Sequence, residues 1–588
     1  MERTVIQQLE CTAAERGDQP AMKAKRNGVW EATSWTGYRE QVLGAARGFL
    51  ALGLERGDGV VMMGYNRPEW FVSDLAAIAA GGVPAGIYTN STAEQCRYIA
   101  QHCEARIAVL ENAEYLARFR EFSGELPRLE AVVLMEGASE EEGVYAWSDL
   151  LGLGDELFEE RLRERIDAQR AGDLCSLIYT SGTTGSPKAV MLSHRNILWV
   201  GEKLRESFEI GPGDNVISYL PLSHIAEQVV SLYAPLVAGA CSWFAESLEQ
   251  LGDNLREVRP QIFFAVPRVW EKIQAKMEAA GAAAPPLKRK IAAWARRLGM
   301  EARRAEQSGG RRPLLYPLAE RLVFSKVRAR LGLDRARFVS TSAAPISLHT
   351  LEFFGSLGIT ILEVYGMSEC TGPTTFSYPD RYRFGAAGVA ISGSEVRVAD
   401  DGEVLMRGPH VFLGYYKDEE ATRETLDEEG WIHSGDVGEL DEEGFLRITD
   451  RKKELLITSG GKNVAPQPIE GKLKAIPGVA LGVVIGDRRN YLTALLTLDP
   501  ETVAARAEQA GSPARDTAAA AACPIFRESL ERQIERLNAT LARYETIKRF
   551  EVLPGQFSID GGELTPTMKL KRRVVTEKYA GEIEQLYA

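Results

Sequence analysis

Residues 179–188, with the sequence Tyr-Thr-Ser-Gly-Thr-Thr-Gly-Ser-Pro-Lys, have the composition of a loop that binds phosphate. The glycines free the backbone, the hydroxyls can donate hydrogen bonds, and Lys188 adds a positive charge. The apolar run 174–179 before it predicts a buried strand. Ser193 is a candidate N-cap for a helix through 196–200. We therefore expect a strand–loop–helix unit whose successive N–H groups hold an anion.

This loop is not a Walker A phosphate loop. That motif requires a glycine, then lysine, then serine or threonine. Here Pro187 precedes Lys188, and Ala189 follows it. Taken by itself, the stretch is also compatible with an ordinary surface loop rich in glycine, serine and threonine.

Four further motifs follow the loop along the chain. They are 365–369 (Tyr-Gly-Met-Ser-Glu), 430–436 (Gly-Trp-Ile-His-Ser-Gly-Asp), 450–454 (Asp-Arg-Lys-Lys-Glu) and 566–569 (Pro-Thr-Met-Lys). With the loop, they resemble in order and spacing the motifs of the AMP-forming adenylating enzymes, which include acyl-CoA synthetases, luciferases and peptide-synthetase adenylation domains. The resemblance covers nearly the whole chain. Five motifs in the same order are far less easily met by chance than one.

The resemblance implies catalytic roles for three residues. Lys569 would bridge the attacking carboxylate and the α-phosphate of ATP as charge develops between them. Glu369 would bind Mg²⁺, which prefers oxygen ligands, with the hydroxyl of Thr180 as a second ligand. His224 would lie at the mouth of the acyl pocket.

The same resemblance implies a nucleotide site. Tyr365 would form one wall of the adenine pocket and 343–345 the opposite wall. Asp436 would accept hydrogen bonds from the ribose hydroxyls, and Arg451 would support the ribose or phosphate from the other side. The residues implied to bind ATP are Thr180, Ser181, Gly182, Thr183, Thr184, Gly185, Lys188, Ala343, Ala344, Tyr365, Gly366, Met367, Ser368, Asp436 and Arg451.

The second half of the reaction involves the residues after 450–454. In the resembled enzymes a small lid domain rotates about a hinge, which here is Lys453. The rotation withdraws Lys569 and brings a glycine-containing segment to the site. Gly460, Gly461 and Lys462 are the counterparts of that segment and would line the CoA thiol tunnel. Such gating also keeps water away from a reactive mixed anhydride.

Three positions depart from the family pattern. Met568 precedes the catalytic lysine where many relatives have glycine, and neighbouring Lys571 leaves a second register open. The adenine loop has Ala343 and Ala344 where glycines are common. Gln228 stands where some long-chain relatives have a tryptophan gate, so the gating residue of the acyl pocket is not identified.

The elements that must position these residues follow an alternating pattern. Apolar runs at 60–63, 107–110 and 131–134 predict buried strands between helical segments, as in an α/β fold. From about 385 to 446, short strands alternate with Gly and Asp turns. We therefore predict an α/β fold with a large N-terminal domain of α/β subdomains, a small β-rich subdomain, and a small mobile C-terminal α+β lid domain.

The predicted boundaries follow from these changes of texture and from the hinge motif. The N-terminal adenylating domain would comprise residues 1–449, with the β-rich subdomain at about 385–446. The hinge would lie at 450–454 and the lid domain at 455–588.

Composition excludes several classes of protein. The chain of 588 residues has 45% apolar and 26% charged residues and a net charge of −12, which argues against nucleic acid as a main partner. No run reaches the ~18 apolar residues of a membrane span, and the N-terminus lacks the apolar core of a signal peptide. Seven scattered cysteines and six dispersed histidines offer no disulfide or zinc pattern. We expect a cytoplasmic protein.

The segment 288–337 is crowded with arginine and lysine interleaved with leucine and aromatic residues. A solvated helical face is one interpretation. A basic amphipathic surface that contacts anionic lipid is the other, and it would place the protein peripherally on the inner membrane surface.

Within the family, several stretches most resemble long-chain to very-long-chain fatty acyl-CoA synthetases of the bubblegum type. They are 342–346, 365–373, 457–470 and 578–587. The implied reaction converts a fatty acid, ATP and CoA into acyl-CoA, AMP and diphosphate through an acyl-adenylate, with Mg²⁺ as cofactor.

Two enzymatic alternatives stay open. One is a fatty acyl-AMP ligase that loads a carrier protein, and the other is a CoA ligase for a different carboxylic acid. A non-catalytic scaffold is disfavoured because Glu369, Asp436 and Lys569 are all present. Acyl chain length and oligomeric state are not determined by the sequence.

Overall fold

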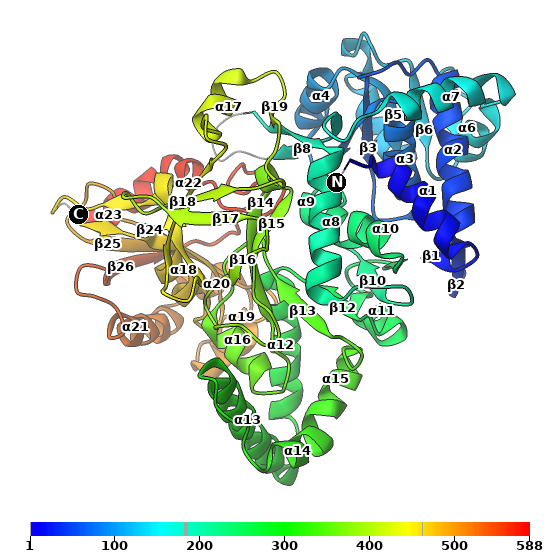
Figure 1. The fold of residues 1–588 in the computed structure, drawn as a ribbon. Helices are drawn as coiled ribbons and strands as arrows, with labels where there is room; N and C mark the ends of the chain where they lie inside the picture. Colours follow the sequence, from blue (N-terminus) through cyan, green and yellow to red (C-terminus); the bar gives the residue numbers. More distant parts are fainter. Residues whose placement is uncertain (1, 181–185, 461) are drawn as a thin grey trace. The chain divides into compact units, whose positions relative to one another are not determined.

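The computed structural model describes residues 2–180, 186–460 and 462–588 (Figure 1). The chain packs as two compact units. Unit 1 takes in the residues up to Ala344, Leu348–Val396 and Met406–His433, and unit 2 takes in Pro345–Ser347, Arg397–Leu405 and Ser434–Ala588. The predicted α/β fold with a large N-terminal and a smaller C-terminal part is confirmed. The domain boundary at 449 and the hinge at 450–454 stay predictions, because packing alone does not report movement.

Unit 1 contains an eight-stranded sheet with a parallel centre. The runs predicted as buried strands form β3, β5 and β6, which pair in parallel. Apolar side chains on this sheet, with those of α4 and α5, form one continuous core. In order across the sheet, the strands are β19 (Gly414–Tyr415), β9 (Lys188–Ser193), β8 (Leu174–Thr180), β4 (Val83–Ile87), β3 (Gly59–Met63), β5 (Ala105–Leu110), β6 (Ala131–Leu134) and β7 (Val144–Ala146).

A second sheet of unit 1 has nine strands. Parallel pairs join its middle strands, and antiparallel hairpins form both ends. In order, the strands are β16 (Val389–Ala390), β15 (Gly372–Phe376), β14 (Leu362–Met367), β13 (Phe338–Thr341), β12 (Ile262–Phe264), β10 (Asn215–Ser218), β11 (Cys241–Phe244), β1 (Pro20–Arg26) and β2 (Val29–Ser34).

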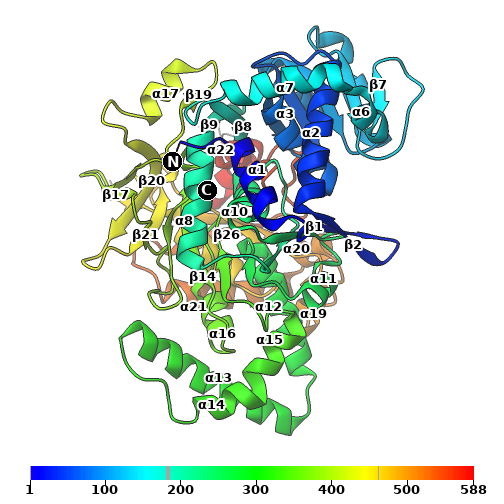
Figure 2. The ribbon, with the colours of Figure 1, turned by 45° about the vertical axis from the view of Figure 1, so that its right-hand side comes forward.

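Helices of unit 1 lie between and around these strands (Figures 1 and 2). They are α1 (Val5–Arg16), α2 (Trp35–Ala51), α3 (Pro68–Ala79), α4 (Ala93–His102), α5 (Ala113–Arg120), α6 (Trp147–Leu153), α7 (Glu156–Ala168), α8 (His194–Phe208), α9 (Ile225–Glu227), α10 (Ala234–Ala238), α11 (Leu251–Val258), α12 (Pro267–Ala282), α13 (Pro286–Gln307), α14 (Tyr316–Ala319), α15 (Ser325–Leu331), α16 (Leu348–Gly355) and α17 (Glu419–Thr425). Short helical turns are η1 (Ser123–Glu125), η2 (Gln228–Tyr233), η3 (Glu320–Phe324) and η4 (Ser368–Cys370).

Unit 2 contains a three-stranded sheet, β24 (Val479–Ile485), β25 (Leu492–Leu498) and β26 (Ile547–Val552), with an apolar core on each face. A hairpin of β22 (Leu456–Ile457) and β23 (Asn463–Val464) and the turn η5 (Lys452–Glu454) precede it. Its helices are α18 (Pro466–Lys474), α19 (Val503–Gln509), α20 (Thr517–Ala522), α21 (Pro524–Asn538), α22 (Arg572–Lys578) and α23 (Ala580–Tyr587).

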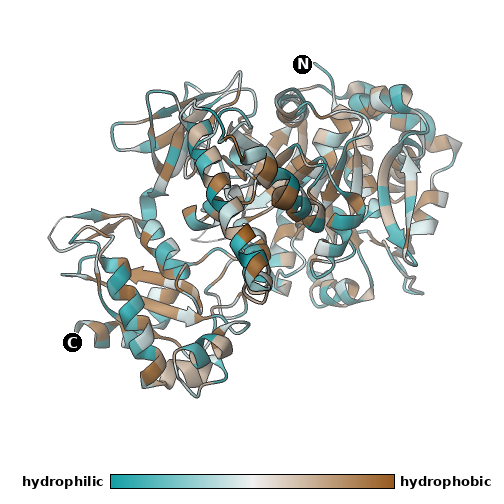
Figure 3. Cartoon of the chain, turned by 90° about the horizontal axis from the view of Figure 1, so that it is seen from below, coloured by the Kyte–Doolittle hydropathy of each residue, from teal (hydrophilic) through white to brown (hydrophobic). Residues whose placement is uncertain are grey.

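Short strands occupy the stretch predicted to be β-rich. They form a four-stranded sheet in the order β17 (Glu395–Val398), β18 (Glu403–Arg407), β20 (Ile432–Leu440) and β21 (Leu446–Arg451). Both the helices and the strands carry hydrophilic and hydrophobic segments (Figure 3). Among the described residues, no helix is both long and apolar enough to cross a membrane.

The phosphate loop connects two strands, which corrects one expectation. Antiparallel β8 and β9 form a hairpin, with Thr180 opposite Lys188, so the expected strand–loop–helix unit is wrong. The helix comes after β9, and its predicted N-cap is confirmed because Ser193 accepts a hydrogen bond from the Asn196 N–H. The dipole of α8 therefore begins one strand away from the loop.

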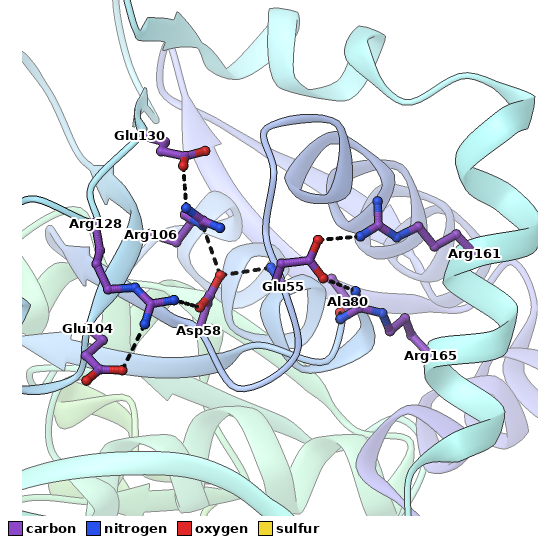
Figure 4. Close-up of polar contacts among 9 residues, drawn as sticks. All are labelled: Glu55, Asp58, Ala80, Glu104, Arg106, Arg128, Glu130, Arg161 and Arg165. Atoms are coloured by element: carbon purple, nitrogen blue, oxygen red, sulfur yellow. Dashed lines mark hydrogen bonds and ion pairs between the residues drawn. The ribbon is translucent and has the colours of Figure 1, made fainter.

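A polar network holds the start of β3 to its neighbours (Figure 4). The buried Asp58 carboxylate accepts hydrogen bonds from Arg106 Nε at 3.0 Å and Arg128 at 2.8 Å. Glu55, in the same turn, binds Arg161 and Arg165 of α7, each at 2.7 Å. The buried, doubly bonded Asp58 orients the strand edge, whereas the pairs of the exposed Glu55 contribute less.

Candidate active site

The base of the phosphate hairpin is closed by Thr180 and Lys188. The Thr180 hydroxyl donates to the Lys188 carbonyl at 3.4 Å, and both residues are half-buried. Ser181, Gly182, Thr183, Thr184 and Gly185, which were predicted to bind phosphate, lie outside the described residues. The predicted metal-binding role of Thr180 stays a prediction. The hydrogen bond to Lys188 does not prevent it, because the hydroxyl oxygen keeps a lone pair that can coordinate a metal ion.

Tyr415 joins the phosphate hairpin to the predicted metal ligand. Its hydroxyl donates to Glu369 Oε1 at 2.6 Å, and the ammonium of Lys188 lies 4.8 Å from the centre of its ring. Tyr415 and Glu369 are both buried. Burial, and then the Glu369 charge, raises the pKa of the Tyr415 hydroxyl well above its usual range, so it remains a donor. The structure thus brings two predicted site residues together through a third.

No motif in the sequence pointed to Tyr415. It belongs to the two-residue strand β19, which pairs with β9 at the edge of the sheet. The pairing of Tyr415 with Val190 places it two residues along from Lys188. Such a neighbour can be found only from the strand register.

Strand β14 and the following turn carry the predicted adenine motif. Tyr365 is half-buried in β14, opposite Thr375 of β15, and Glu369 lies in the turn η4. Gly366 is required by packing, because a Cβ atom there would lie 1.8 Å from the Gly372 carbonyl oxygen. Met367 and Ser368, also predicted to contact the nucleotide, are half-buried between these residues.

The loop after β13 contains the predicted opposite wall of the adenine pocket. Ala343 has a φ of +73°, a left-handed conformation that favours glycine, and Ala344 is exposed. The family's preference for glycine in this loop therefore has a backbone reason. This chain adopts the same kind of turn with an alanine.

Glu369 is suited to binding a magnesium ion that is shared with a nucleotide. In the part of the chain that the structure describes, no group of three or more His, Cys, Asp or Glu side chains could hold a metal ion by itself. Mg²⁺ is usually bound by one or two carboxylates together with substrate phosphates. One Glu369 oxygen accepts from Tyr415, which fixes the orientation of the carboxylate. The donor set fits Mg²⁺ bound as a nucleotide complex.

In unit 2, the predicted ribose residues Asp436 and Arg451 are neighbours. They face each other across β20 and β21, and Arg451 Nε lies 3.3 Å from Asp436 Oδ1. The Gly435 N–H donates to Glu403 Oε1 at 2.8 Å, while Glu403 Oε2 binds Lys452 at 3.0 Å. The buried Glu403 therefore ties the turn before Asp436 to the lysine beside the predicted hinge, a link that the sequence motifs did not indicate.

Lys569 lies in a tight loop of unit 2. The Thr565 N–H donates to the Lys569 carbonyl at 2.8 Å, and the Lys569 N–H donates to the Thr565 hydroxyl at 3.0 Å. Met568 has a φ of +62°, again a conformation that favours glycine. Glycine, which the resemblance implies for many relatives at this position, adopts such a conformation without strain. The loop presents a half-buried Lys569 from a closed turn.

The predicted hinge and CoA segment also lie in unit 2. Lys453 is exposed in η5, and the buried Asp450 before it accepts the Arg451 and Gln467 N–H groups. Burial raises the pKa of the Asp450 carboxyl to about 6. Lys462 follows the exposed Gly460 turn, and Gly461 lies outside the described residues. Their predicted roles in the hinge and thiol tunnel stay predictions.

His224 caps α9 in unit 1. Its Nδ1 accepts the Ala226 N–H at 3.1 Å, so a neutral ring carries its proton on Nε2. Gln228 is buried, and its amide donates to the Leu222 carbonyl at 2.9 Å. Gln228 therefore braces the turn that carries His224.

Glu227 anchors the same turn from inside. Its buried Oε1 accepts hydrogen bonds from Ser231 Oγ at 2.6 Å, Ser218 Oγ at 2.7 Å and the Tyr219 N–H at 3.1 Å. Burial raises the pKa of its carboxyl to about 7. When the Glu227 carboxyl is protonated on its other oxygen, Oε1 remains a carbonyl oxygen that accepts these hydrogen bonds.

Substituting Glu227→Gln is expected to stabilise the protein at pH 8 by up to about 3 kcal/mol, with little effect at pH 5. The raised pKa means that the folded wild type holds a proton which the unfolded chain releases above pH 4.5. Its stability therefore falls as the pH rises from 4.5 to about 7. The uncharged amide of the Glu227→Gln variant does not titrate, so the variant does not lose this stability as the pH rises. Urea unfolding followed by tryptophan fluorescence at both pH values measures the difference, with the exposed Glu160→Gln as control. Parallel pH profiles for wild type and Glu227→Gln would contradict the assignment.

A small apolar cavity lies between α8 and the nine-stranded sheet. Its volume is about 20 Å³, and Leu204, Val216 and Ile262 are among its lining residues. The rings of Phe208 and Phe338 stack beside it with centroids 3.7 Å apart. A space of this size accommodates about one water-sized probe.

Comparison with known proteins gives two family matches. The family described as AMP-binding enzyme matches residues 9–416, and the AMP-binding enzyme C-terminal domain matches residues 453–588.

Similar proteins extend over the whole chain. A long-chain-fatty-acid–CoA ligase of Xenopus laevis is 42% identical over 625 residues, covering 99% of this chain and 84% of the relative. One of Gallus gallus is 40% identical, covering 100% and 81%. Among solved structures, the adenylation domain of a carboxylate reductase from Mycobacterium chelonae has a TM-score of 0.75 at 21% identity, covering 100% of this chain and 91% of that chain. At that identity the structural likeness concerns the fold.

Proposed function

Because this chain belongs to the family of AMP-binding enzymes, we propose that it is an AMP-forming ligase that joins long-chain fatty acids to CoA. The observation that carries the proposal is similarity at 36–42% identity, over 97% or more of this chain, to proteins named long-chain-fatty-acid–CoA ligases. The arrangement of Lys188, Tyr415 and Glu369 supports it, since a cation and a carboxylate are held together at the base of the phosphate hairpin.

In the first step the fatty-acid carboxylate attacks the α-phosphate of ATP, and diphosphate leaves. Both reactants are anions, so alignment and charge neutralisation dominate the catalysis. Lys188 and the phosphate hairpin hold the leaving diphosphate, and Lys569 bridges the carboxylate and the α-phosphate. Bound Mg²⁺ would supply further positive charge at the phosphate oxygens, with Glu369 as its protein ligand. Asp436 and Arg451 hold the ribose, and Tyr365 the adenine.

In the second step the CoA thiol displaces AMP from the acyl-adenylate. We assign the exchange of catalytic groups to rotation about Lys453, which replaces Lys569 by Gly460–Lys462. The ion pairs of Lys452 with Glu403 and Asp401, at 3.0 and 2.6 Å, support this position, because they fix the residue beside the pivot. His224 presents its Nε2–H at the mouth of the acyl pocket.

Incubation with palmitate, ATP, Mg²⁺ and CoA tests this proposal. We expect palmitoyl-CoA, AMP and diphosphate in equal amounts, measured by liquid chromatography. Palmitoyl-AMP without thioester would indicate the carrier-protein ligase instead. Turnover with aromatic or short-chain acids alone would indicate a CoA ligase for another acid, and no product with any acid would overturn the enzymatic proposal.

We also propose that the enzyme acts in the cytoplasm, with the basic region at 288–337 in peripheral contact with the inner membrane surface. Residues 286–331 contain thirteen lysines and arginines and three glutamates, a net charge of +10 in a chain of net charge −12. Anionic lipid attracts such a segment. A membrane is also where long-chain fatty acids partition.

A further inference from the structure

Helix α13 and the continuous helical run α14–η3–α15 form an arm of unit 1, at the lower end of the ribbon in Figure 1. The arm has a small core of its own. The core residues are Ala295, Leu298, Ala302, Tyr316, Ala319 and Phe324.

Close contacts fix α13 to the rest of unit 1. A Cβ atom on Gly299 would lie 2.2 Å from the Ser356 carbonyl oxygen, and Arg296 Nε donates to Ser356 Oγ at 3.0 Å. The buried Arg303 donates to Thr360 Oγ1 at 2.5 Å. These contacts anchor α13 to the rest of unit 1, and the core described above joins the remainder of the arm to α13.

Leucines project from the outer face of this arm. Leu315, at the N-cap of α14, Leu318 of α14 and Leu322 of η3 recur every three or four residues along this run, and they are 53%, 47% and 43% exposed. Leu314, in the preceding turn, is 98% exposed. The described part of the chain has seventeen exposed large apolar side chains, and six of them lie within the 36 residues 287–322. We call Leu314, Leu315, Leu318 and Leu322 the leucine ridge.

Basic side chains without acidic partners surround the leucine ridge along the chain. Eight exposed lysines and arginines of the arm make no ion pair with any residue that the structure describes. They are Lys288, Arg289, Lys290, Arg304, Arg311, Arg321, Lys326 and Arg330. Their charges are therefore available to an external anion. Elsewhere on unit 1, the exposed Arg120 and the half-buried Arg97 and Arg161 pair with glutamates.

We propose that the leucine ridge inserts into the headgroup region of a bilayer containing anionic phospholipid, while the surrounding lysines and arginines bind the lipid phosphates. This assigns the inserting residues of the membrane contact and rests on the proposed function for its substrate. An amphipathic helix with leucines on one face and basic residues around them binds in the plane of a membrane interface. The exposed leucines are buried by insertion, and the local positive charge matches an anionic surface on an otherwise acidic protein.

Vesicle flotation tests the leucine ridge directly. We expect the full-length protein to float with vesicles of 30% phosphatidylglycerol in phosphatidylcholine, and to bind pure phosphatidylcholine at least about tenfold more weakly. Leu314→Ser/Leu318→Ser/Leu322→Ser should lower binding to the anionic vesicles by at least about tenfold. Arg311→Gln/Arg321→Gln should lower it by about fivefold per charge, and added salt should weaken the wild type in the same way.

Leu157→Ser/Leu248→Ser is the matched control, because these leucines are 81% and 56% exposed elsewhere on unit 1. It should bind vesicles like the wild type. Equal binding by wild type and the triple ridge variant would overturn the proposal. So would equal binding to neutral and anionic vesicles. If the triple variant instead changes the sedimentation coefficient without changing flotation, the leucine ridge is a contact between two copies of the chain.

A separate readout distinguishes this proposal from the proposed enzymatic function. Flotation needs no substrate, so it reports on the leucine ridge even if the chain is not a ligase. The triple variant should convert palmitate delivered from cyclodextrin at the wild-type rate but lose at least about threefold in rate when palmitate is delivered from anionic vesicles. Normal flotation without any ligase activity would overturn the enzymatic proposal alone.

Discussion

Replacing Lys569 by alanine is expected to slow acyl-adenylate formation by about 10²–10³-fold. The ammonium group stabilises negative charge that develops as the carboxylate attacks the α-phosphate, and alanine leaves that charge unmatched. Thioester formation from supplied palmitoyl-AMP and CoA should stay within about threefold of the wild type, because the proposed mechanism withdraws the lysine for that step. Diphosphate release measures the first reaction, and palmitoyl-CoA formation measures the second.

Lys571→Ala is the matched control for register. Lys571 lies two residues further on. Its backbone N–H donates to the Glu563 carbonyl, and it is the N-cap residue of α22. The hydrogen bonds between Thr565 and Lys569 involve backbone atoms and the threonine hydroxyl, so Lys569→Ala can keep the loop closed. If Lys571→Ala loses adenylation and Lys569→Ala does not, the two lysines exchange roles.

Glu369→Gln is expected to lower adenylation by at least about 10²-fold and to raise the Mg²⁺ concentration needed for half-maximal rate. The neutral amide is a much weaker ligand for a hard cation than a carboxylate. It can still accept the hydrogen bond from Tyr415, so the fold around η4 should be preserved. Adenylation rates titrated with Mg²⁺ at saturating ATP measure the effect. An unchanged Mg²⁺ dependence would remove Glu369 as the metal ligand.

A pair of tyrosine variants tests how much the orientation of the Glu369 carboxylate contributes, apart from its binding of Mg²⁺. Tyr415→Phe removes the hydroxyl that donates to Glu369 and leaves the carboxylate in place, so its effect should be about tenfold, smaller than that of Glu369→Gln. Tyr416→Phe is the control, because its ring contacts His102 rather than Glu369. Equal effects of the two variants would point to general damage to β19 and the residue that follows it.

Strand patterns and capping signals predicted much of the local structure. The buried strands β3, β5 and β6 and the Ser193 cap are local in origin, since apolar runs and a single hydroxyl determine them. Strand β9 was missed: it pairs with β8 across a short loop, and on its other side it pairs with β19, which is distant in the chain. Pairing between distant strands is decided by tertiary packing.

Motif order likewise predicted the residues that take part in the chemistry better than the residues that hold them in place. Asp436 and Arg451 were assigned to one ribose site and prove to be cross-strand neighbours. Tyr415, Glu403 and Glu227 carry no motif, yet each holds a predicted site residue or its turn in place. Supporting residues act through contacts that sequence spacing does not encode. Which residues make these contacts is decided by how the close-packed interior brings distant segments together.

By itself the sequence determined that the chain is an α/β protein of the adenylating type, and it identified Lys188, Glu369, Asp436 and Lys569 as the residues to examine. The chemistry of these residues follows from their side-chain types and from the order of the motifs, and both can be read from the sequence without a structure. Only the tertiary structure decided that Tyr415 connects Lys188 to Glu369, that Ala343 and Met568 adopt conformations suited to glycine, and that the leucines of the basic arm face outward. These properties depend on strand register, backbone dihedral angles and burial, which arise when distant segments pack together.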